Sequence, residues 1–144
     1  MSNEEKVVQM LEHVPLFGRL KRRQVRALAN ACIDRTCAAG EVIVPQDRDG
    51  YGFFVIVSGA AEAVRERNDD STVVLNTFGP GDYFGELALL DKGPRTASVV
   101  ATEETDCLIL PRGNFLGLLR RDGDMAVEIM IELATRFRSA LEIY

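Results

Sequence analysis

A succession of short apolar runs between about Cys32 and Leu110, separated by glycine or acidic turns, constrains the fold of this 144-residue chain most strongly. The runs are rich in valine, isoleucine and phenylalanine, which favour strands. They are Glu41–Val44, Phe53–Val57, Ala61–Val64, Val73–Leu75, Ala97–Val100 and Cys107–Leu110. This spacing is typical of an antiparallel barrel or jelly roll, which closes away exposed sheet edges.

Helical spacing of apolar residues flanks the β-rich region on both sides. Two helices are predicted before it, over Glu4–Glu12 and Lys21–Ala31, and two after it, over Asn114–Arg120 and Asp124–Ile143. We therefore predict a single α+β domain over 1–144. Its parts are N-terminal helices (1–31), an antiparallel β-roll or jelly roll (32–112) and C-terminal helices (113–144).

The composition is that of an ordinary soluble protein, with 47% hydrophobic and 27% charged residues and a net charge of −5. No apolar run approaches the roughly 20 residues that a membrane span requires, and the N-terminus lacks the regions of a secretory signal. We expect a cytoplasmic protein without a membrane span. The negative charge argues against direct nucleic-acid binding, and the basic run Arg19–Arg23 is interpreted as a solvated helix face.

The cysteines and the histidine argue against a metal site. Cys32, Cys37 and Cys107 are odd in number and lack paired metal spacing, so we expect buried, reduced thiols. His13 is the one histidine of the chain, which excludes a histidine-rich ligand set. We therefore expect no metal and no cofactor.

The segment Phe84–Val99 carries groups that suit a sugar-linked phosphate. Gly85 is followed by mostly good helix formers, which predicts a tight turn that enters a short helix. The free amides at the start of such a helix attract anions. Arg95 follows Pro94, whose ring stiffens the turn, and a guanidinium can donate two parallel hydrogen bonds to a phosphate. Thr96 and Ser98 add hydroxyls at alternate positions of the strand that follows.

Glu86 favours a nucleotide over inorganic phosphate, because a carboxylate repels a bare anion but accepts a hydrogen bond from a sugar hydroxyl. Each residue alone also fits a structural role without a ligand. In that interpretation Glu86 and Arg95 form an ion pair, and the glycines of Gly79–Gly85 only mark the turns of a loop. The complete set of residues favours the binding site.

This segment resembles the phosphate-binding cassette of the cyclic-nucleotide-binding domain family. The resemblance extends to Val14–Phe17, Ala39–Ile43, Val55–Gly59 and Gly79–Phe84, and so covers nearly the whole chain. Asp47 departs from the family, which commonly has glycine after a glutamine at this place.

The resemblance implies a β-roll whose cassette spans 84–99, with a last helix that folds over the base as a lid. It implies that Glu86 accepts the ribose 2′-hydroxyl, that Arg95 pairs with the cyclic phosphate and that backbone amides of Leu87, Ala88 and Ala97 help to hold it. The ligand-binding residues predicted in this way are Gly85, Glu86, Leu87, Ala88, Arg95, Thr96, Ala97 and Ser98.

Two further groups are candidates for contact with the base. Val64, Val74 and Leu75 are candidates for an apolar wall, although they are equally good core residues. The lid candidates are Arg136, Phe137, Ala140 and Tyr144. Along the last helix, helical spacing predicts one apolar face made of Ala126, Ile129, Met130, Leu133, Phe137 and Leu141.

The resemblance implies a non-catalytic sensor of cAMP, cGMP or both, which transmits binding through its C-terminal helix to a protein effector, with a homodimer as one assembly. Thr96 directly after Arg95 accompanies acceptance of cGMP in the family, and its hydroxyl can accept a hydrogen bond from the guanine 2-amino group. Alternatives stay open: an interaction scaffold without a ligand, or a regulatory fragment of a transcription factor, channel or kinase. Hydrolysis of a phosphodiester normally needs clustered metal ligands, so we expect no enzyme.

Overall fold

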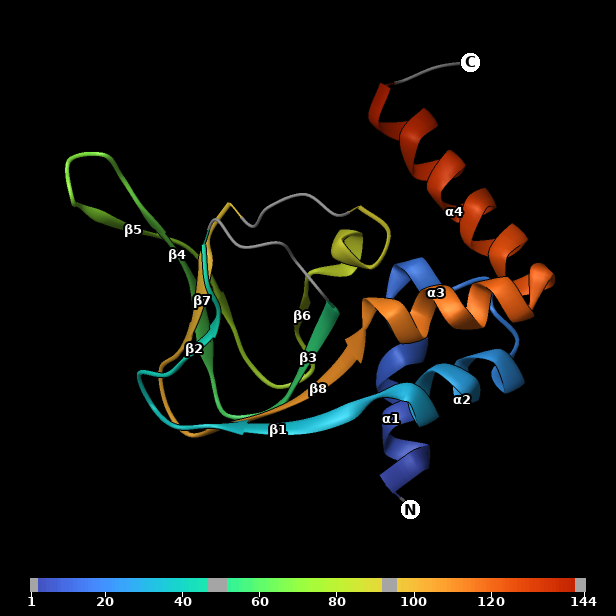
Figure 1. The fold of residues 1–144 in the computed structure, drawn as a ribbon, viewed down its shortest axis with the longest axis horizontal. Helices are drawn as coiled ribbons and strands as arrows, with labels where there is room; N and C mark the ends of the chain where they lie inside the picture. Colours follow the sequence, from blue (N-terminus) through green and yellow to red (C-terminus); the bar gives the residue numbers. More distant parts are fainter. Residues whose placement is uncertain (1–2, 47–51, 92–95, 142–144) are drawn as a thin grey trace. The chain divides into compact units, whose positions relative to one another are not determined.

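The computed structural model describes residues 3–46, 52–91 and 96–141. The chain forms two compact units: a β-rich unit, Cys32–Arg112, and a helical unit, which combines Met1–Ala31 with Gly113–Tyr144. Figure 1 shows the elements of each unit along the chain.

The β-rich unit consists of two four-stranded sheets, in the orders β1-β8-β3-β6 and β2-β7-β4-β5, with antiparallel pairing throughout the described strands. The strands are β1 (Ile33–Cys37), β2 (Val42–Val44), β3 (Gly52–Ser58), β4 (Ala61–Glu66), β5 (Thr72–Phe78), β6 (Tyr83–Phe84), β7 (Ser98–Ala101) and β8 (Thr105–Pro111). Together with the helices this arrangement confirms the predicted α+β β-roll.

Both sheets contribute to one apolar core. Its buried members include Phe54, Ile56 and Ile109 from the first sheet and Ala63 and Val99 from the second. Because side chains alternate between the two faces of a strand, every second residue of these strands enters the core.

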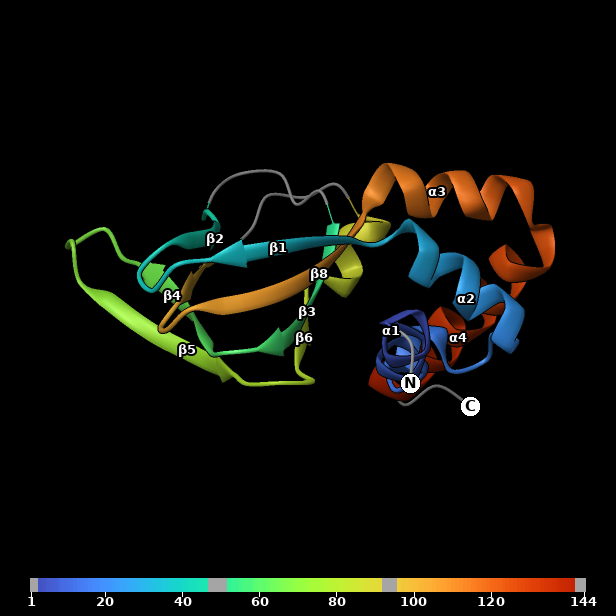
Figure 2. The same ribbon diagram turned by 90° about the horizontal axis from the view of Figure 1, so that it is seen from below.

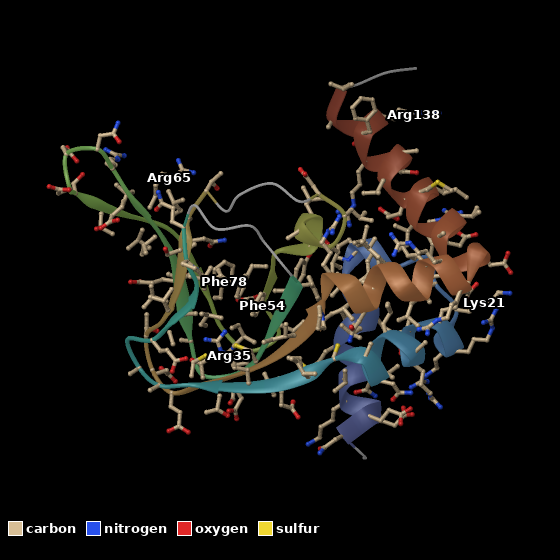
Figure 3. All side chains as sticks on the ribbon, viewed as in Figure 1. Lys21, Arg35, Phe54, Arg65, Phe78 and Arg138 are labelled. Carbon is tan, nitrogen blue, oxygen red and sulfur yellow. The ribbon has the colours of Figure 1, made fainter. Side chains whose placement is uncertain are left out.

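Aromatic rings extend this core toward β6. The ring of Phe84 stacks on that of Phe54, with centroids 4.9 Å apart, and Phe78 lies 5.1 Å from Phe84. Phe54 and Phe78 point into the space between the two sheets in Figure 3. The rings thus join the last strand before the cassette to both sheets.

The turn between β3 and β4 requires glycine. Gly59 has a φ of 91°, and a Cβ at this position would meet the Glu104 carbonyl oxygen and lie 2.7 Å from the Cα of Thr105. Thr105 is fully buried, and its Oγ1 accepts a hydrogen bond from the Ala60 amide at 3.1 Å. The turn is therefore clamped against the start of β8.

A second turn, Gly79–Asp82, aims the chain into β6. The Asp82 carboxylate accepts the Gly79 amide at 2.7 Å, and Gly81 has a φ of 88°. The Gly81 amide donates to the Ile56 carbonyl at 2.8 Å, and the Ile56 amide donates to the Asp82 carbonyl at 2.9 Å. These two bonds attach the turn to β3, directly before the cassette.

The helical unit contains α1 (Asn3–Glu12), the 3-10 helix η1 (Pro15–Phe17), α2 (Arg22–Ala31), α3 (Arg112–Arg121) and α4 (Gly123–Leu141). The four predicted helices are confirmed, with small shifts at their ends. Helices α2 and α3 lie side by side in both views (Figures 1 and 2), and the Asn114 side chain donates to the Ala31 carbonyl at 3.3 Å. The rings of Phe17 and Phe115, both buried, lie 6.1 Å apart.

Ion pairs within the helical unit occupy much of the basic run. Arg22 pairs with Glu5 at 2.6 Å, Arg19 with Glu128 at 2.8 Å and Arg23 with Asp122 at 3.5 Å. These arginines are about half exposed or more, so their pairs are partly solvated. This partial solvation agrees with the prediction that the basic run Arg19–Arg23 is a solvated helix face.

Asp122 caps α4. Its Oδ1 atom accepts the Met125 amide at 3.1 Å, and this hydrogen bond is the main cause that lowers the pKa of the Asp122 carboxyl. A capping carboxylate also interacts favourably with the positive end of the helix dipole.

The three cysteines are free thiols, as expected, although Cys32 is only partly buried. Burial raises the pKa of Cys32 to about 12 and that of Cys107 to about 11. Among the described helices, none is long and apolar enough to cross a membrane.

Candidate functional site

The cassette opens with a left-handed glycine and one short helix. Gly85 adopts φ 82° and ψ 17°, a conformation that residues with a side chain rarely take. The 3-10 helix η2 (Glu86–Leu89) follows directly, and its Leu89 is fully buried. The predicted tight turn and short helix are confirmed, and the buried leucine anchors them.

The amides at the start of η2 differ in their availability. The Ala88 amide donates to the Gly85 carbonyl at 3.0 Å and forms the first turn of the helix. The amides of Glu86 and Leu87 precede that bond, so the helix itself does not use them. The Ala88 amide is therefore engaged within the first turn of η2, whereas the Leu87 amide is not used by that turn.

Glu86 lies in the first turn of η2 and is partly buried, with its Oε2 atom shielded from solvent. The Leu87 side chain is 59% exposed, in contrast to Leu89. The cassette thus holds a partly buried carboxylate in the first turn of η2 and presents an apolar side chain at its surface.

The last residues of the cassette lead into β7. Thr96 is exposed, whereas Ala97 is partly buried and packs against the core between the sheets. Ser98 begins β7, and its hydroxyl oxygen accepts the Gln46 amide at 2.7 Å while its own hydrogen remains able to donate. Arg95, Tyr144 and Asp47 lie outside the described residues.

The three residues predicted as an apolar wall lie on one hairpin. Val64 of β4 pairs with Val74 of β5, next to a register shift between Ala63 and Val64. Val64 is partly buried, whereas Val74 and Leu75 are 53% and 46% exposed. β5 is an edge strand, and the hairpin is drawn in green in Figure 1. These side chains are available to an apolar ligand group.

The last helix is apolar along one face, but that face is only partly buried. Ile129 is buried, whereas Met130, Phe137 and Leu141 are 59%, 64% and 53% exposed. Of the lid candidates, Ala140 is exposed and Arg136 pairs with Glu132 at 3.3 Å, one helical turn earlier. The lid remains a prediction.

Sequence reasoning missed Gln46 and Arg65. Gln46 bonds Ser98 and the backbone of Glu66, and Arg65 donates to the Thr96 carbonyl. Their partners are mainly backbone groups, which every residue carries, so no pattern of residue types points to them. Across the described ranges, no group of three metal-ligating side chains is brought together.

A comparison with family models identifies the family. The model for the cyclic nucleotide-binding domain matches residues 34–122, a range that includes the segment 84–99 and every described strand residue except Ile33. The chain belongs to the cyclic nucleotide-binding domain family.

Two curated relatives show the breadth of this family. The chain is 35% identical over 115 residues to a cAMP-dependent protein kinase regulatory subunit of Yarrowia lipolytica, a match that covers 80% of this chain and 29% of the subunit. It is 35% identical over 126 residues to the cyclic AMP receptor protein of Thermus thermophilus, covering 88% and 58%. The chain thus spans less than two thirds of either relative.

Solved structures share the fold. The N-terminal domain of a transcriptional regulator from Streptomyces coelicolor superposes with a TM-score of 0.86 at 28% identity, covering 93% of this chain and 96% of that domain. The catabolite activator protein of Thermus thermophilus superposes with a TM-score of 0.70 at 35% identity, covering 90% and 61%. The chain is therefore a cyclic nucleotide-binding domain related to regulatory proteins of two kinds.

Proposed function

We propose that this domain reversibly binds a 3′,5′-cyclic mononucleotide, with cAMP as the first candidate, and acts as a non-catalytic sensor. The observation that carries the proposal is the left-handed turn at Gly85, which leads into a helix that begins with Glu86, inside a segment matched by the family model. The names of the kinase and receptor relatives refer to cAMP, which supports the same ligand.

In the proposed complex, Glu86 accepts the ribose 2′-hydroxyl and Arg95 pairs with the cyclic phosphate. The Leu87 and Ala97 amides add hydrogen bonds to the phosphate, while an Ala88 contact requires rearrangement of the Gly85 bond. Thr96 faces the base, and its hydroxyl makes the site tolerant of cGMP. A single neutral hydrogen bond contributes about 0.5–1.5 kcal/mol, which gives tolerance and not exclusive binding.

The exposed side chains of the β4–β5 hairpin and of α4 are the proposed contacts of the base. Val74 and Leu75 offer an apolar wall, and Phe137 offers an exposed ring that can stack on a purine. Arg136, Ala140 and Tyr144 complete the proposed lid. Binding shifts the helical unit only if the lid-closed state holds the nucleotide more tightly.

The output of the sensor is proposed to be a protein effector, on a separate chain or in a longer protein that contains this domain. The match to part of a kinase regulatory subunit and part of a receptor supports both arrangements. We also propose that the domain is cytoplasmic and that it forms a homodimer.

Backbone chemical shifts of isotope-labelled protein test the site directly. Addition of cAMP is expected to shift the Gly85, Leu87 and Ala97 amides most strongly in the β-rich unit. 5′-AMP, whose phosphate is open, serves as the control ligand and is expected to cause small shifts. Shifts confined to the helical unit would contradict the proposed site.

A further inference from the structure

The ladder between β4 and β7 ends at Ser98, within the last residues of the cassette. It runs from Ala61 opposite Ala101 to Val64 opposite Ser98. The next residue of β4, Arg65, donates a hydrogen bond from its Nε atom to the Thr96 carbonyl oxygen at 3.1 Å. An arginine side chain thus continues the connection between the two segments where backbone pairing stops. Figure 3 labels Arg65 on β4.

Gln46 makes a second connection at the same place. Its backbone amide donates to the Ser98 hydroxyl at 2.7 Å. Its side-chain amide bonds both backbone groups of Glu66: Oε1 accepts the Glu66 amide at 2.9 Å, and Nε2 donates to the Glu66 carbonyl at 3.4 Å. Gln46 therefore links the start of β7 to the end of β4.

Arg65 and Gln46, here called the exit clamp, act on the segment Thr96–Ser98. Thr96 is exposed and precedes the first residue of β7, so the strand ladder does not hold it. The hydrogen bond from Arg65 restrains the peptide group of Thr96, and with it the direction of the side chain. The clamp bonds the Thr96 carbonyl and the acceptor side of the Ser98 hydroxyl, so neither bond uses the Thr96 hydroxyl, and the Ser98 hydroxyl remains able to donate.

We propose that Arg65 is a positioning residue that holds Thr96 in the orientation by which the site distinguishes guanine from adenine. This inference rests on the proposed function, because it assigns Thr96 to the base. Without Arg65 the Thr96 segment samples more conformations, and a ligand that needs the hydroxyl must order it on binding. cGMP is that ligand, whereas cAMP makes no use of the hydroxyl in the proposed complex.

Arg65→Met removes the donor and keeps the apolar stem. Arg67→Met is the matched control, because Arg67 is also exposed and its hydrogen bond to the Ser71 carbonyl comes from the backbone amide, which methionine retains. The Kd values of cGMP and cAMP are measured for both variants, for Thr96→Ala and for the double variant Arg65→Met/Thr96→Ala. Arg65→Lys, which keeps a cationic donor, tests for rescue.

Arg65→Met is expected to weaken cGMP about threefold to tenfold relative to cAMP, the size of one neutral hydrogen bond. Arg67→Met is expected to leave the ratio unchanged. In the Thr96→Ala background, loss of Arg65 should not change the ratio further, because the hydroxyl that it positions is gone. Arg65→Lys should bring the ratio of the cGMP and cAMP Kd values part of the way back to that of the unmodified chain.

A purely structural role for Arg65 would lower thermal stability and weaken both nucleotides by the same factor, which would overturn the inference. If Arg67→Met changed the ratio of the cGMP and cAMP Kd values as much as Arg65→Met does, the inference would also be overturned. The cause would then be the loss of a positive charge and not the loss of the bond to Thr96. These outcomes leave the proposed function intact. Failure of the unmodified chain to bind either nucleotide would instead overturn the proposed function, and the inference with it.

Discussion

Arg112 binds the end of the cassette helix within the β-rich unit: its Nη2 atom donates to the Leu90 carbonyl oxygen at 3.4 Å. Leu90 is the C-terminal cap residue of η2, where helix carbonyls need donors. The Nε atom of Arg112 is buried and, among the described residues, has no hydrogen-bond partner. One guanidinium thus combines a stabilising bond with a buried donor that is unpaired among the described residues.

These two effects oppose each other when Arg112 is replaced. Arg112→Met loses a hydrogen bond worth about 0.5–1.5 kcal/mol but also removes a buried donor that costs about 1–3 kcal/mol. The net change in the free energy of unfolding is expected to lie between a loss of about 0.5 kcal/mol and a gain of about 2.5 kcal/mol, together with faster hydrogen exchange of the Leu90 and Asp91 amides. Urea denaturation and exchange of the free protein measure the two quantities. Unchanged exchange at both amides would show that the bond does not hold η2.

Gly59→Ala should destabilise the β-rich unit by more than about 2 kcal/mol, because the added Cβ would overlap the backbone of Glu104 and Thr105. Gly40→Ala is the matched control. Gly40 has a similar φ of 85° but open space around its Cβ position, so the variant should show only the conformational cost of about 1 kcal/mol. Equal losses in the two variants, measured by urea denaturation, would rule out the steric explanation.

The raised pKa values of two cysteine thiols predict loss of stability at high pH. Burial raises the pKa of Cys32 to about 12 and of Cys107 to about 11, both from 9.0. At pH values between 9.0 and these raised pKa values, the folded state binds more protons than the unfolded state. The free energy of unfolding therefore falls as pH rises above about 9. Urea titrations from pH 7 to pH 10.5 should show this fall, and Cys32→Ala/Cys107→Ala should reduce its slope. A slope that persists in the double variant would assign it to other groups.

Glu86→Gln should weaken cAMP about tenfold or more, because a hydrogen bond to a charged acceptor contributes about 1.5–3 kcal/mol. The ligand 2′-deoxy-cAMP distinguishes this bond from a general disturbance. The unmodified chain should bind the deoxy ligand more weakly than cAMP, whereas Glu86→Gln should show a much smaller difference. An undiminished preference for cAMP over the deoxy ligand in the variant would remove Glu86 from the ribose.

The strands that sequence reasoning found are those with apolar runs, and the two that it missed show why. β1 spells Ile-Asp-Arg-Thr-Cys, and Cys37 is its only buried residue, so no run of apolar residues signals it. β6 has only two residues, and its pairing with β3 depends on the turn that Gly81 and Asp82 attach to Ile56. Pairing with neighbours, and not intrinsic preference, makes these segments strands.

The cassette was predictable where residue type decides the conformation. Only glycine readily adopts the angles of Gly85, so the turn was evident. The exit clamp was not evident, because the bond from Arg65 ends on a backbone carbonyl. The apolar spacing of α4 predicted one continuous face but could not show that Met130, Phe137 and Leu141 are exposed, since periodicity identifies a face and not its partner.

Calorimetric titration of ligand-free protein with cAMP and cGMP, with 5′-AMP as the control, tests directly whether this domain senses a cyclic nucleotide. We expect saturable binding of cAMP at one site, weaker or similar binding of cGMP, and far weaker binding of 5′-AMP. Arg95→Ala should cost more than tenfold in cAMP affinity, because it strands the phosphate charge. Absence of heat with both cyclic nucleotides, for a chain shown to be folded, would contradict the assignment of this domain as a nucleotide sensor.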